Sequence, residues 1–275
     1  MNDMTGTFEA DVAALQFLID AGLDVAIDAT PNDRFAARPE PAPPAPAPDT
    51  TRQASAPAAR PSAGAPPIDS DRAAVAAAAA IAPACGTLDE LRNALESFEG
   101  LAIKDTATRL VFADGNPEAD IMIVGEAPGR EEDRVGKPFV GESGKLLDRM
   151  LASIGLDRST VYITNSVLWR PPGNRKPNPS ETEAMLPFLI RHIELVEPKL
   201  MMLAGGAALS ALFGMDARIT RERGKWRDYD ASFGTVPVLP LYHPAYLLRQ
   251  PSLKRDAWAD LRAFRTRAQA LGLTG

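Results

Sequence analysis

The sequence predicts an α/β domain in which a parallel sheet is covered by helices on both faces. Short apolar runs alternate with segments of helical periodicity from about residue 87 to residue 271, and this alternation is typical of βαβ units. The strand candidates are apolar at almost every position, as expected of strands that are buried on both faces. The 190 residues after Cys85 are enough for one such domain with its own core.

The first half of the domain is predicted to contain two helices and two strands. The helix over residues 88–98 begins after Thr87, because TLDE resembles a capping box, in which a threonine and a glutamate satisfy free backbone amides. Residues 110–112 and 121–124 are short apolar runs and are predicted as strands. Residues 145–154 carry apolar side chains at helical spacing, which predicts an amphipathic helix.

The second half repeats this alternation after a Pro-rich loop over residues 168–179. Its strands are predicted from short apolar runs and cover residues 161–164, 200–204 and 237–241. Its helices are predicted from helical periodicity and cover residues 181–196, 207–213 and 253–271. Each pair of neighbouring strands is thus separated by a helix, which is the connection that parallel strands require.

The N-terminal 85 residues have a different composition. Residues 1–29 are predicted to form an extension with a short amphipathic helix over residues 7–26, whose apolar face needs a partner surface on the main domain or on another protein. Residues 30–85 are rich in proline and alanine, and 11 of the 25 prolines lie between residues 30 and 68. Because such a segment buries too little apolar surface to offset its ordering entropy, it is predicted as a disordered linker to a domain over residues 86–275.

Charge is distributed unevenly along the chain. The formal net charge of −6 by itself argues against a nucleic-acid partner. However, residues 1–85 contain 5 basic and 11 acidic residues, whereas residues 86–275 contain 25 of each. Residues 217–275 contain 11 basic and 5 acidic residues. A neutral domain with a basic C-terminal stretch is compatible with binding an anion.

Cysteine and histidine usage excludes several kinds of site. The single cysteine, Cys85, rules out an intramolecular disulfide. Two histidines and one cysteine do not make a conventional zinc site. The N-terminus lacks the basic region and apolar run of a secretory signal, and the apolar run at residues 73–85 is too short and alanine-rich to span a bilayer. We therefore expect a cytoplasmic protein without a metal or a membrane partner.

Three loops that follow predicted strands form the candidate site, because ligands of parallel α/β sheets bind outside the carboxyl ends of the strands. These loops are residues 125–144, 165–180 and 241–249. The first contains five glycines, which permit close backbone approach, and crowded carboxylates, which argue against a phosphate cradle. Its spacing is neither GxGxxG nor a Walker loop. Phe139 suggests a flat ligand that stacks on the ring, and a solvated acidic turn is an equally weighted alternative.

The other two loops carry polar and basic side chains. Asn165 lies at a strand end, where its amide can pair with the edge of a nucleobase, although a lone asparagine there is more often a turn or cap residue. Arg170, Arg175 and Lys176 surround a rigid Pro-Pro-Gly turn and fit a groove for a polyanion. His243 follows a buried strand and precedes a proline, so it is a better catalytic candidate than the other histidine, which lies within a predicted helix.

Together these loops carry a family resemblance. The segments GEAPGREEDRVGKPFVGESGKLLDRML, VYITNSVLWRPPGNRKPNPSE and VLPLYHPAYLLR resemble the family 4 uracil-DNA glycosylases of the uracil-DNA glycosylase superfamily in content, order and spacing. The resemblance runs from about residue 87 to residue 264 and covers neither the extension nor the linker. It implies a three-layer α/β/α fold with a four-stranded parallel sheet, in agreement with the predicted strands.

The resemblance also implies roles for individual residues. Four residues are expected to be catalytic: Glu126, Glu132, Asn174 and His243. Of these, His243 is expected to face uracil O2, and Glu132 is favoured over Glu126 as the group that activates water. The residues expected to bind uracil are Gly125, Ala127, Phe139 and Asn165. The residues expected to contact DNA are Arg170, Arg175, Lys176 and Arg249.

The chain departs from the resembled family at the cofactor. Typical family 4 members hold an iron–sulfur cluster on four cysteines. The matching places here are Glu99 or Gly100 beside Leu101, then Trp169 and Met185. None of these is a cysteine, and Cys85 cannot hold a four-iron cluster by itself. We therefore predict a protein without a cofactor, in which Leu101, Trp169 and Met185 fill that space with apolar packing.

The resemblance implies a monofunctional hydrolase that flips uracil out of DNA, hydrolyses the N-glycosidic bond and leaves an abasic site for base excision repair. We expect a monomer that acts on uracil-containing DNA. One alternative is a non-catalytic binder of uracil-containing or damaged DNA, since a structural cofactor has been lost. A protein that traps uracil-DNA covalently through a loop histidine is disfavoured, because residues 169–181 contain no histidine. An unrelated nucleotide-binding α/β protein is the last alternative.

Overall fold

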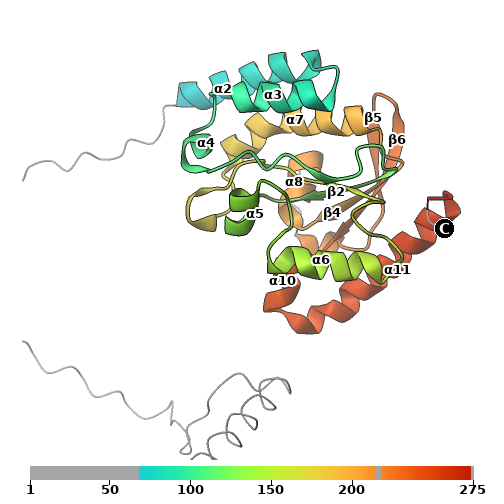
Figure 1. The fold of residues 1–275 in the computed structure, drawn as a ribbon. Helices are drawn as coiled ribbons and strands as arrows, with labels where there is room; N and C mark the ends of the chain where they lie inside the picture. Colours follow the sequence, from blue (N-terminus) through green and yellow to red (C-terminus); the bar gives the residue numbers. More distant parts are fainter. Residues whose placement is uncertain (1–67, 215–217, 274–275) are drawn as a thin grey trace, which may run out of the picture. The chain divides into compact units, whose positions relative to one another are not determined.

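A mixed six-stranded sheet forms the centre of the domain (Figure 1). The computed structural model describes residues 68–214 and 218–273, so the extension and the helix predicted over residues 7–26 lie outside the described residues. The order of the strands across the sheet is β1-β3-β2-β4-β6-β5. The strands are β1 (Asp114–Gly115), β2 (Ile121–Gly125), β3 (Tyr162–Asn165), β4 (Leu200–Ala204), β5 (Arg227–Ala231) and β6 (Gly234–Leu241).

The four inner strands are parallel, whereas the two edge strands are antiparallel to their neighbours. β2 pairs in parallel with β3 and β4, and β4 pairs in parallel with β6. β1 pairs antiparallel with β3, and β5 pairs antiparallel with β6. The expected four-stranded parallel sheet is therefore the centre of a wider, mixed sheet. Periodicity did not predict β5 because this strand, at the edge of the sheet, is partly exposed along its length and contains no apolar run.

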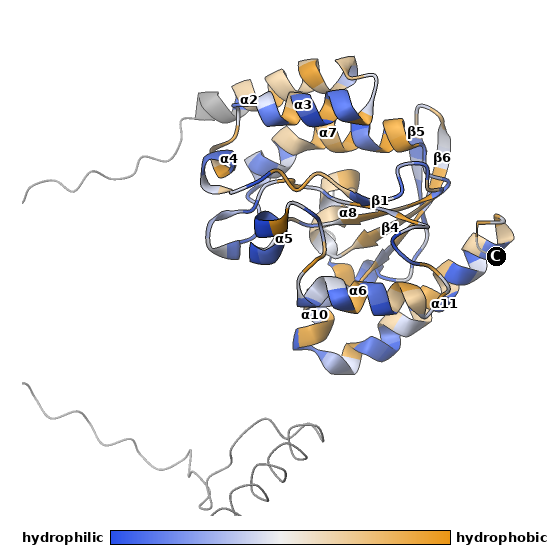
Figure 2. Ribbon diagram, viewed as in Figure 1, coloured by the Kyte–Doolittle hydropathy of each residue, from blue (hydrophilic) through white to orange (hydrophobic). Residues whose placement is uncertain are grey.

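Helices flank the sheet, and Figure 2 shows hydrophobic residues on the strands between them. One face is covered by α7 (Pro179–Val196) and α8 (Gly206–Phe213), with α2 (Ile68–Ile81) and α3 (Leu88–Ser97) packed on α7. The other face is covered by α6 (Glu142–Ala152), α10 (Pro244–Arg249) and α11 (Lys254–Ala270). The short helices are α4 (Ala102–Thr106), α5 (Arg130–Val135) and α9 (Ile219–Glu222). Within the described ranges, no helix is long and apolar enough to cross a membrane.

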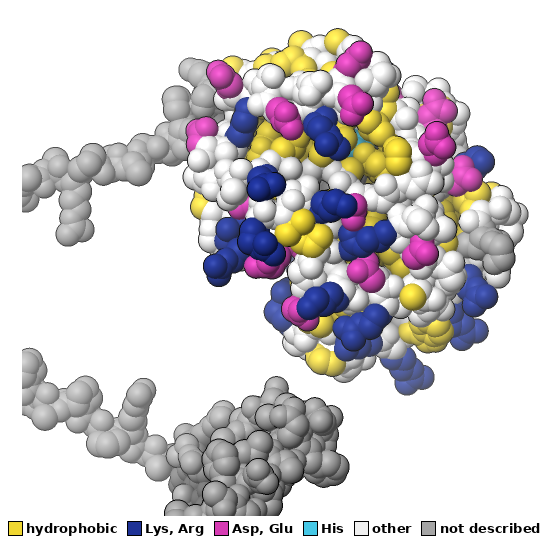
Figure 3. Space-filling model, in the orientation of Figure 1, with side chains coloured by type: hydrophobic (Ala, Val, Ile, Leu, Met, Phe, Trp, Pro, Cys, Tyr) yellow, Lys and Arg dark blue, Asp and Glu magenta, His cyan; other side chains and the backbone are white. Residues whose placement is uncertain are grey.

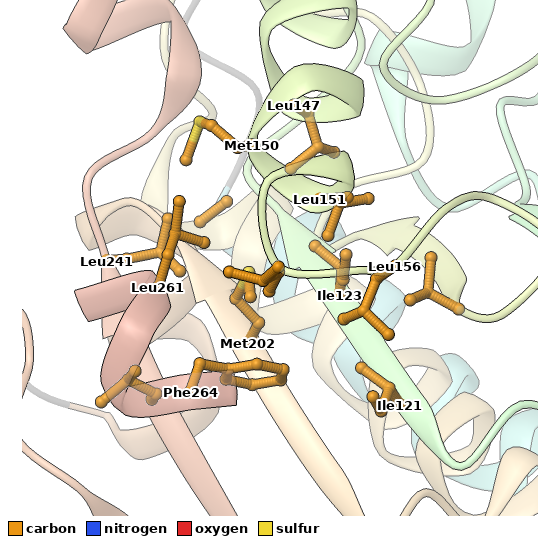
Figure 4. Close-up of a cluster of buried hydrophobic side chains, with 14 of the residues drawn as sticks. Ile121, Ile123, Leu147, Met150, Leu151, Leu156, Met202, Leu241, Leu261 and Phe264 are labelled. Carbon is orange, nitrogen blue, oxygen red and sulfur yellow. The ribbon is translucent and has the colours of Figure 1, made fainter. Parts of the chain in front are cut away.

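Alternate residues of the inner strands point into two different cores, as the pleat of a strand requires. Ile123 of β2 packs in one core with Leu147 of α6 and Phe264 of α11 (Figure 4). Its neighbours Met122 and Val124 pack in the other core, together with residues of α7 and α8. This double burial explains why the inner strands are apolar at nearly every position. It also makes the sheet a rigid support for the loops that follow its strands.

The C-terminal end of the predicted linker is folded. Residues 68–81 form α2, and Ala82–Ala84 form a 3₁₀ turn. Ala74, Ala78 and Cys85 are buried in the core around α2, α3 and α7. Alanine has the highest helix propensity, and its small side chain lets two helices approach closely. The prediction of disorder is therefore wrong for residues 68–85, whereas the rest of the linker lies outside the described residues.

One predicted strand is wrong, although other element boundaries agree closely. Residues 110–112 belong to no strand: the N–H of Val111 donates to the carbonyl of Leu168 at 2.9 Å, and pairing with β3 begins only at Asp114. The predicted start of α3 is confirmed, because the side chain of Thr87 accepts a hydrogen bond from the N–H of Glu90 at 3.1 Å.

Candidate functional site

A pocket of about 490 Å³ lies at the carboxyl ends of the parallel strands. The three predicted loops, which follow β2, β3 and β6, all contribute to it, because the carboxyl ends of parallel strands meet at one edge of a sheet. Residues from segments far apart in the sequence thereby share one cavity. The predicted site residues that line it are Glu126, Ala127, Glu132, Phe139, Asn165, Asn174, Arg175, Lys176, His243 and Arg249.

Sequence reasoning missed part of the lining, and one of the predicted DNA contacts lies outside it. The additional lining residues include Ser143, Gly205, Gly206, Ile219, Thr220 and Tyr246. The Gly205–Gly206 pair directly follows β4, so the rule that selected the other three loops also applies to it. Arg170 does not line the pocket and instead donates a hydrogen bond to Asn174.

The backbone of Gly125 forms the base against which two site side chains pack. Gly125 pairs in register with Asn165 at the ends of β2 and β3. A Cβ atom on Gly125 would lie 2.6 Å from the ring of Phe139 and closer still to the amide oxygen of Asn165. Both side chains are buried. The glycine therefore allows a ring and an amide to lie side by side at one end of the pocket.

The ring of Phe139 is held by an unusual backbone conformation. Its φ is 54°, in the left-handed region that few residues other than glycine adopt. The carbonyl of Phe139 accepts a hydrogen bond from the guanidinium of Arg158, which also pairs with Asp114 at 2.7 Å. The ring stacks on His243, with 5.4 Å between centroids and 25° between the ring planes. These contacts fix the aromatic wall of the pocket.

His243 presents a neutral ring with a defined tautomer. Its Nδ1 accepts a hydrogen bond from the N–H of Ala245 at 3.1 Å, where His243 is the N-cap of α10. The pKa of His243 is lowered to about 4, mainly by burial and also by the charge of Arg249, whereas the charge of Glu132 opposes the shift. The ring is therefore neutral at pH 7, and because Nδ1 is an acceptor, the proton lies on Nε2. His243 can thus donate one hydrogen bond from Nε2.

The carboxylate of Glu132 is committed to the backbone. One oxygen, Oε1, accepts from the N–H groups of Val140 at 3.0 Å and Gly141 at 2.8 Å. The other, Oε2, accepts from the N–H of Gly129 at 3.1 Å in the capping box of α5. The residue is 7% exposed. Glu132 therefore ties together both ends of the first loop, which is a structural task that the sequence did not reveal.

Glu126, by contrast, has a carboxylate that lines the pocket without a hydrogen-bond partner among the described residues. Burial raises the pKa of Glu126, and the charges of Lys176 and Arg249 oppose the rise. A half-buried carboxylate with an elevated pKa has the properties of a general base. Glu132 accepts three hydrogen bonds, so Glu126 is the glutamate with the greater free acceptor capacity.

The rim of the pocket is formed by an exposed turn and several cations. Asn174 has a φ of 56°, and its Oδ1 accepts a hydrogen bond from Nε of Arg170 at 2.6 Å. Arg175 forms two hydrogen bonds to the carboxylate of Glu181, at 2.8 and 2.6 Å, so much of its charge is already compensated. Lys176 and Arg249 are exposed, and their charges act on Glu126. They are the cations best placed to meet an anionic ligand at this rim.

His192 lies away from the pocket, in the core, in accordance with the interpretation of it as a structural residue. It is 1% exposed, accepts or donates one hydrogen bond with the hydroxyl of Tyr162 at 2.6 Å, and stacks on Phe112 with 4.5 Å between centroids. Burial lowers its pKa to about 3, so it is neutral in the folded protein.

The place that matches the family's iron–sulfur cluster is packed with apolar side chains. Leu101, Trp169 and Met185 are each at most 6% exposed and belong to the same core. In that core the rings of Phe98 and Phe188 meet edge to face at 5.2 Å. In residues 68–214 and 218–273, no three His, Cys, Asp or Glu side chains are grouped so that they could hold a metal ion. The residues at this place do not fit a cluster.

Comparisons with known proteins agree with the geometry. The family model of the uracil DNA glycosylase superfamily matches residues 112–262. The chain is 39% identical over 180 residues to the type-4 uracil-DNA glycosylase of Archaeoglobus fulgidus, which covers 64% of this chain and 90% of that protein. It is 43% identical over 157 residues to the type-4 uracil-DNA glycosylase of Thermotoga maritima, which covers 56% of this chain and 80% of that protein.

Proposed function

The chain belongs to the type-4 uracil-DNA glycosylases of the uracil-DNA glycosylase superfamily, and from this premise we propose that it removes uracil from DNA by hydrolysing the N-glycosidic bond. The observation that carries the proposal is the pocket itself, in which the Nε2–H donor of His243, the amide of Asn165, the ring of Phe139 and the carboxylate of Glu126 converge. The product is an abasic site, the substrate of the next step of base excision repair.

Recognition of uracil requires the base to leave the DNA stack, at a cost of a few kcal/mol. Stacking on the ring of Phe139 and hydrogen bonds from the amide of Asn165 to the edge of the base would offset this cost. The two side chains adjoin each other on Gly125, so a flat base can meet the ring with its face and the amide with its polar edge.

Departure of uracil develops negative charge on the base and positive charge on the sugar. A donor aimed at uracil O2 stabilises the transition state more than the ground state, because the charge on O2 grows as the bond breaks. Nε2 of His243 is such a donor, since Nδ1 is held by the N–H of Ala245. A neutral imidazole also lets uracil leave as an anion without a proton transfer from the ring.

Water must then attack C1′ of the sugar. We assign the activation of this water to Glu126 and not to Glu132, because both oxygens of Glu132 accept backbone hydrogen bonds. The water forms the new C1′–O bond, the N-glycosidic bond breaks, and the carboxylate of Glu126 takes the proton. Asn174, at the rim, can orient the water or the adjacent sugar-phosphate.

Contacts with DNA phosphates are expected to be few. On the face shown in Figure 3, Lys and Arg side chains are interspersed with Asp and Glu side chains and form no continuous basic surface. At the pocket, Lys176 and Arg249 remain as candidate phosphate contacts, whereas Arg175 is paired with Glu181. Non-specific affinity is then modest, and the extracted base supplies most of the recognition.

Alkali cleavage tests the proposed function. Single- and double-stranded oligonucleotides with one uracil are incubated with the protein and then treated with alkali, which breaks the strand at abasic sites. We expect breaks at the uracil position and none in matched oligonucleotides with thymine. Binding of the uracil oligonucleotides without breaks would instead identify a non-catalytic binder.

Adding one methyl group at Gly125 is expected to disrupt base recognition. In Gly125→Ala, the new Cβ atom would force apart the ring of Phe139 and the amide of Asn165, at a cost of about 1–3 kcal/mol in unfolding free energy. We expect KM for uracil oligonucleotides to rise at least about tenfold. Thermal unfolding and steady-state kinetics measure the two effects. Gly86→Ala is the control, because a Cβ atom there would meet only the carboxylate of Glu90, at an ordinary contact distance of 3.4 Å. An unaltered KM in Gly125→Ala would contradict the proposed role of this packing.

We further propose that the domain folds without an iron–sulfur cluster, since apolar side chains occupy the matching place. Protein that is purified anaerobically from iron-supplemented cells is expected to contain no stoichiometric iron or sulfide by elemental analysis. Its absorbance should lack the broad visible bands of iron–sulfur charge transfer. About four irons per chain would overturn this proposal and leave the glycosylase function untouched.

A further inference from the structure

The turn that carries Asn174 is exposed and conformationally demanding. Residues 172–176 are exposed. Gly173 and Asn174 both have positive φ, 65° and 56°. Within the turn, the N–H of Asn174 donates to the carbonyl of Pro171 at 3.1 Å. Since no core packing holds the tip of this turn, the orientation of the Asn174 side chain depends on specific polar contacts.

Arg170 supplies such a contact. Its Nε donates to Oδ1 of Asn174 at 2.6 Å, and its side chain is 25% exposed. A guanidinium has donors only, so the amide oxygen of Asn174 must face it. The amide nitrogen is thereby directed away from Arg170, and the amide plane cannot flip without losing a charge-assisted hydrogen bond. Arg170 itself does not line the pocket.

Asp133 in turn holds Arg170. Oδ2 of Asp133 lies 3.8 Å from Nη1 of Arg170, and the carboxylate side chain is only 4% exposed. Its Oδ1 accepts from the N–H groups of Thr108 at 2.7 Å and Arg109 at 3.1 Å, so the carboxylate cannot follow a moving arginine. A buried carboxylate needs a counter-charge, and Arg170 provides it.

Helix α5 thus has two adjacent acidic residues with parallel tasks. Glu132 fixes the loop that carries Phe139, and Asp133 anchors the arginine that fixes Asn174. This single helix therefore fixes the wall of the pocket that carries Phe139 relative to the wall that carries Asn174. Removing the Arg170 side chain, which links Asp133 to Asn174, should misplace Asn174 and leave the rest of the pocket in place.

We propose that Arg170 is a positioning residue for Asn174, anchored by Asp133, and not a contact to the DNA backbone. The proposal rests on the proposed glycosylase function. It reassigns a residue whose charge and place in a Pro-rich loop suggested phosphate binding. A positioning residue changes the rate of the chemical step, whereas a phosphate-binding residue changes the affinity and its salt dependence.

A double-mutant cycle tests the proposal. Single-turnover rates of uracil release are measured for Arg170→Met, Asn174→Ala and the double variant. We expect Arg170→Met to lower the rate about 10- to 100-fold, as misplacement of a catalytic group does, and to have little further effect once Asn174 is alanine. Arg170→Lys, which keeps the positive charge and N–H donors on a single nitrogen, should restore part of the rate. Arg134→Met on the outer side of α5, where the arginine is 70% exposed, is the matched control and should leave the rate unchanged.

Salt dependence of DNA binding separates the two roles. The slope of log Kobs against log salt concentration becomes shallower by about 0.7–0.9 for each phosphate that the protein no longer neutralises. We expect Lys176→Met to make the slope shallower by about this amount and Arg170→Met to leave it unchanged. A shallower slope in Arg170→Met, or rate effects that multiply in the double variant, would overturn the proposal.

A spectroscopic readout does not depend on turnover. In ¹H–¹⁵N spectra, the side-chain amide of Asn174, identified by its loss in Asn174→Ala, should shift in Arg170→Met and keep its position in Arg134→Met. Failure of the wild-type protein to cleave uracil oligonucleotides would overturn the proposed function alone. An amide signal that is unaffected by Arg170→Met would overturn the positioning role, whatever the wild-type activity.

Discussion

Replacing His243 by alanine is expected to lower the rate constant for uracil release about 100- to 1000-fold, the usual loss when one fixed donor to a developing oxyanion is removed. His243 can act in this way because its Nδ1 is held by the N–H of Ala245, which places the proton on Nε2. The measurement is single-turnover cleavage of a uracil oligonucleotide with the enzyme in excess. A loss of less than tenfold would show that His243 is not a catalytic residue.

The side chain of His243 also caps α10. The loss of the Nε2 donor must therefore be distinguished from the loss of the helix cap. Asparagine is a strong N-cap residue and keeps an acceptor for the N–H of Ala245. His243→Asn is therefore expected to retain the thermal unfolding temperature while its rate still falls, because the shorter amide cannot reach the position of Nε2. Equal losses of stability and rate in both variants would indicate that the cap is the main task of His243.

The lowered pKa of His243, about 4, gives the pH dependence a definite sign. The folded-state pKa lies below the ordinary 6.5, so the contribution of the neutral ring to stability is present above pH 6.5 and is lost as the pH falls toward 4. The rate should show no step near pH 6.5. An acidic limb should instead follow protonation of Glu126, whose pKa is raised by burial. A step near pH 6.5 that disappears in His243→Asn would contradict the assignment.

Glu126→Gln is expected to lower the rate about 100- to 10,000-fold, which is the range for losing a general base. The substitution preserves size but replaces one carboxylate oxygen by an NH₂ group, so it removes both the negative charge and the ability to take a proton. Since the carboxylate of Glu126 forms no hydrogen bond with the described residues, the thermal unfolding temperature should not fall. The acidic limb of the pH profile should also disappear. A rate within tenfold of wild type would show that water is activated by another group.

The corresponding change at Glu132 should act on stability. Glutamine has one oxygen and one NH₂ group. In Glu132→Gln, the NH₂ donor would therefore face either the N–H donor of Gly129 or those of Val140 and Gly141. We expect unfolding free energy to fall by about 1–3 kcal/mol, the cost of an unsatisfied buried polar group. Chemical denaturation measures this loss. A variant with normal stability and no activity would return the water-activating role to Glu132.

Sequence reasoning located the site because its main signals are local. A short apolar run followed by a glycine or a polar residue marks the carboxyl end of a buried strand, and parallel strands end at one edge. The loops with Glu126, Asn165 and His243 were predicted to meet for this reason, and all three line the pocket. The burial of Leu101, Trp169 and Met185 agrees with the apolar packing predicted from their residue types at the places that the resemblance matches to cysteines.

Local signals failed where a partner segment determines the structure. The alanine-rich segment before Cys85 has the composition of a linker, and it becomes α2 because it packs on α7. The edge strands β1 and β5 lack apolar runs, and their pairing with β3 and β6 defines them. Their short or partly exposed sequences carry no period that a single-sequence argument can detect.

By itself, the sequence determined the fold class, the family and the residues that gather at the pocket, because residue type and spacing along the chain carry these. Only the tertiary structure decided which residues are free to react. The family resemblance favoured Glu132 over Glu126 as the water-activating group, but backbone amides from the far side of a loop donate to the carboxylate of Glu132. Arg170 was predicted to contact DNA from its charge and its place in a Pro-rich loop, whereas in the structure it donates to Asn174 and lies 3.8 Å from Asp133 of α5. The hydrogen-bonding capacity of a side chain is used by neighbours in space, and these neighbours are distant in the chain.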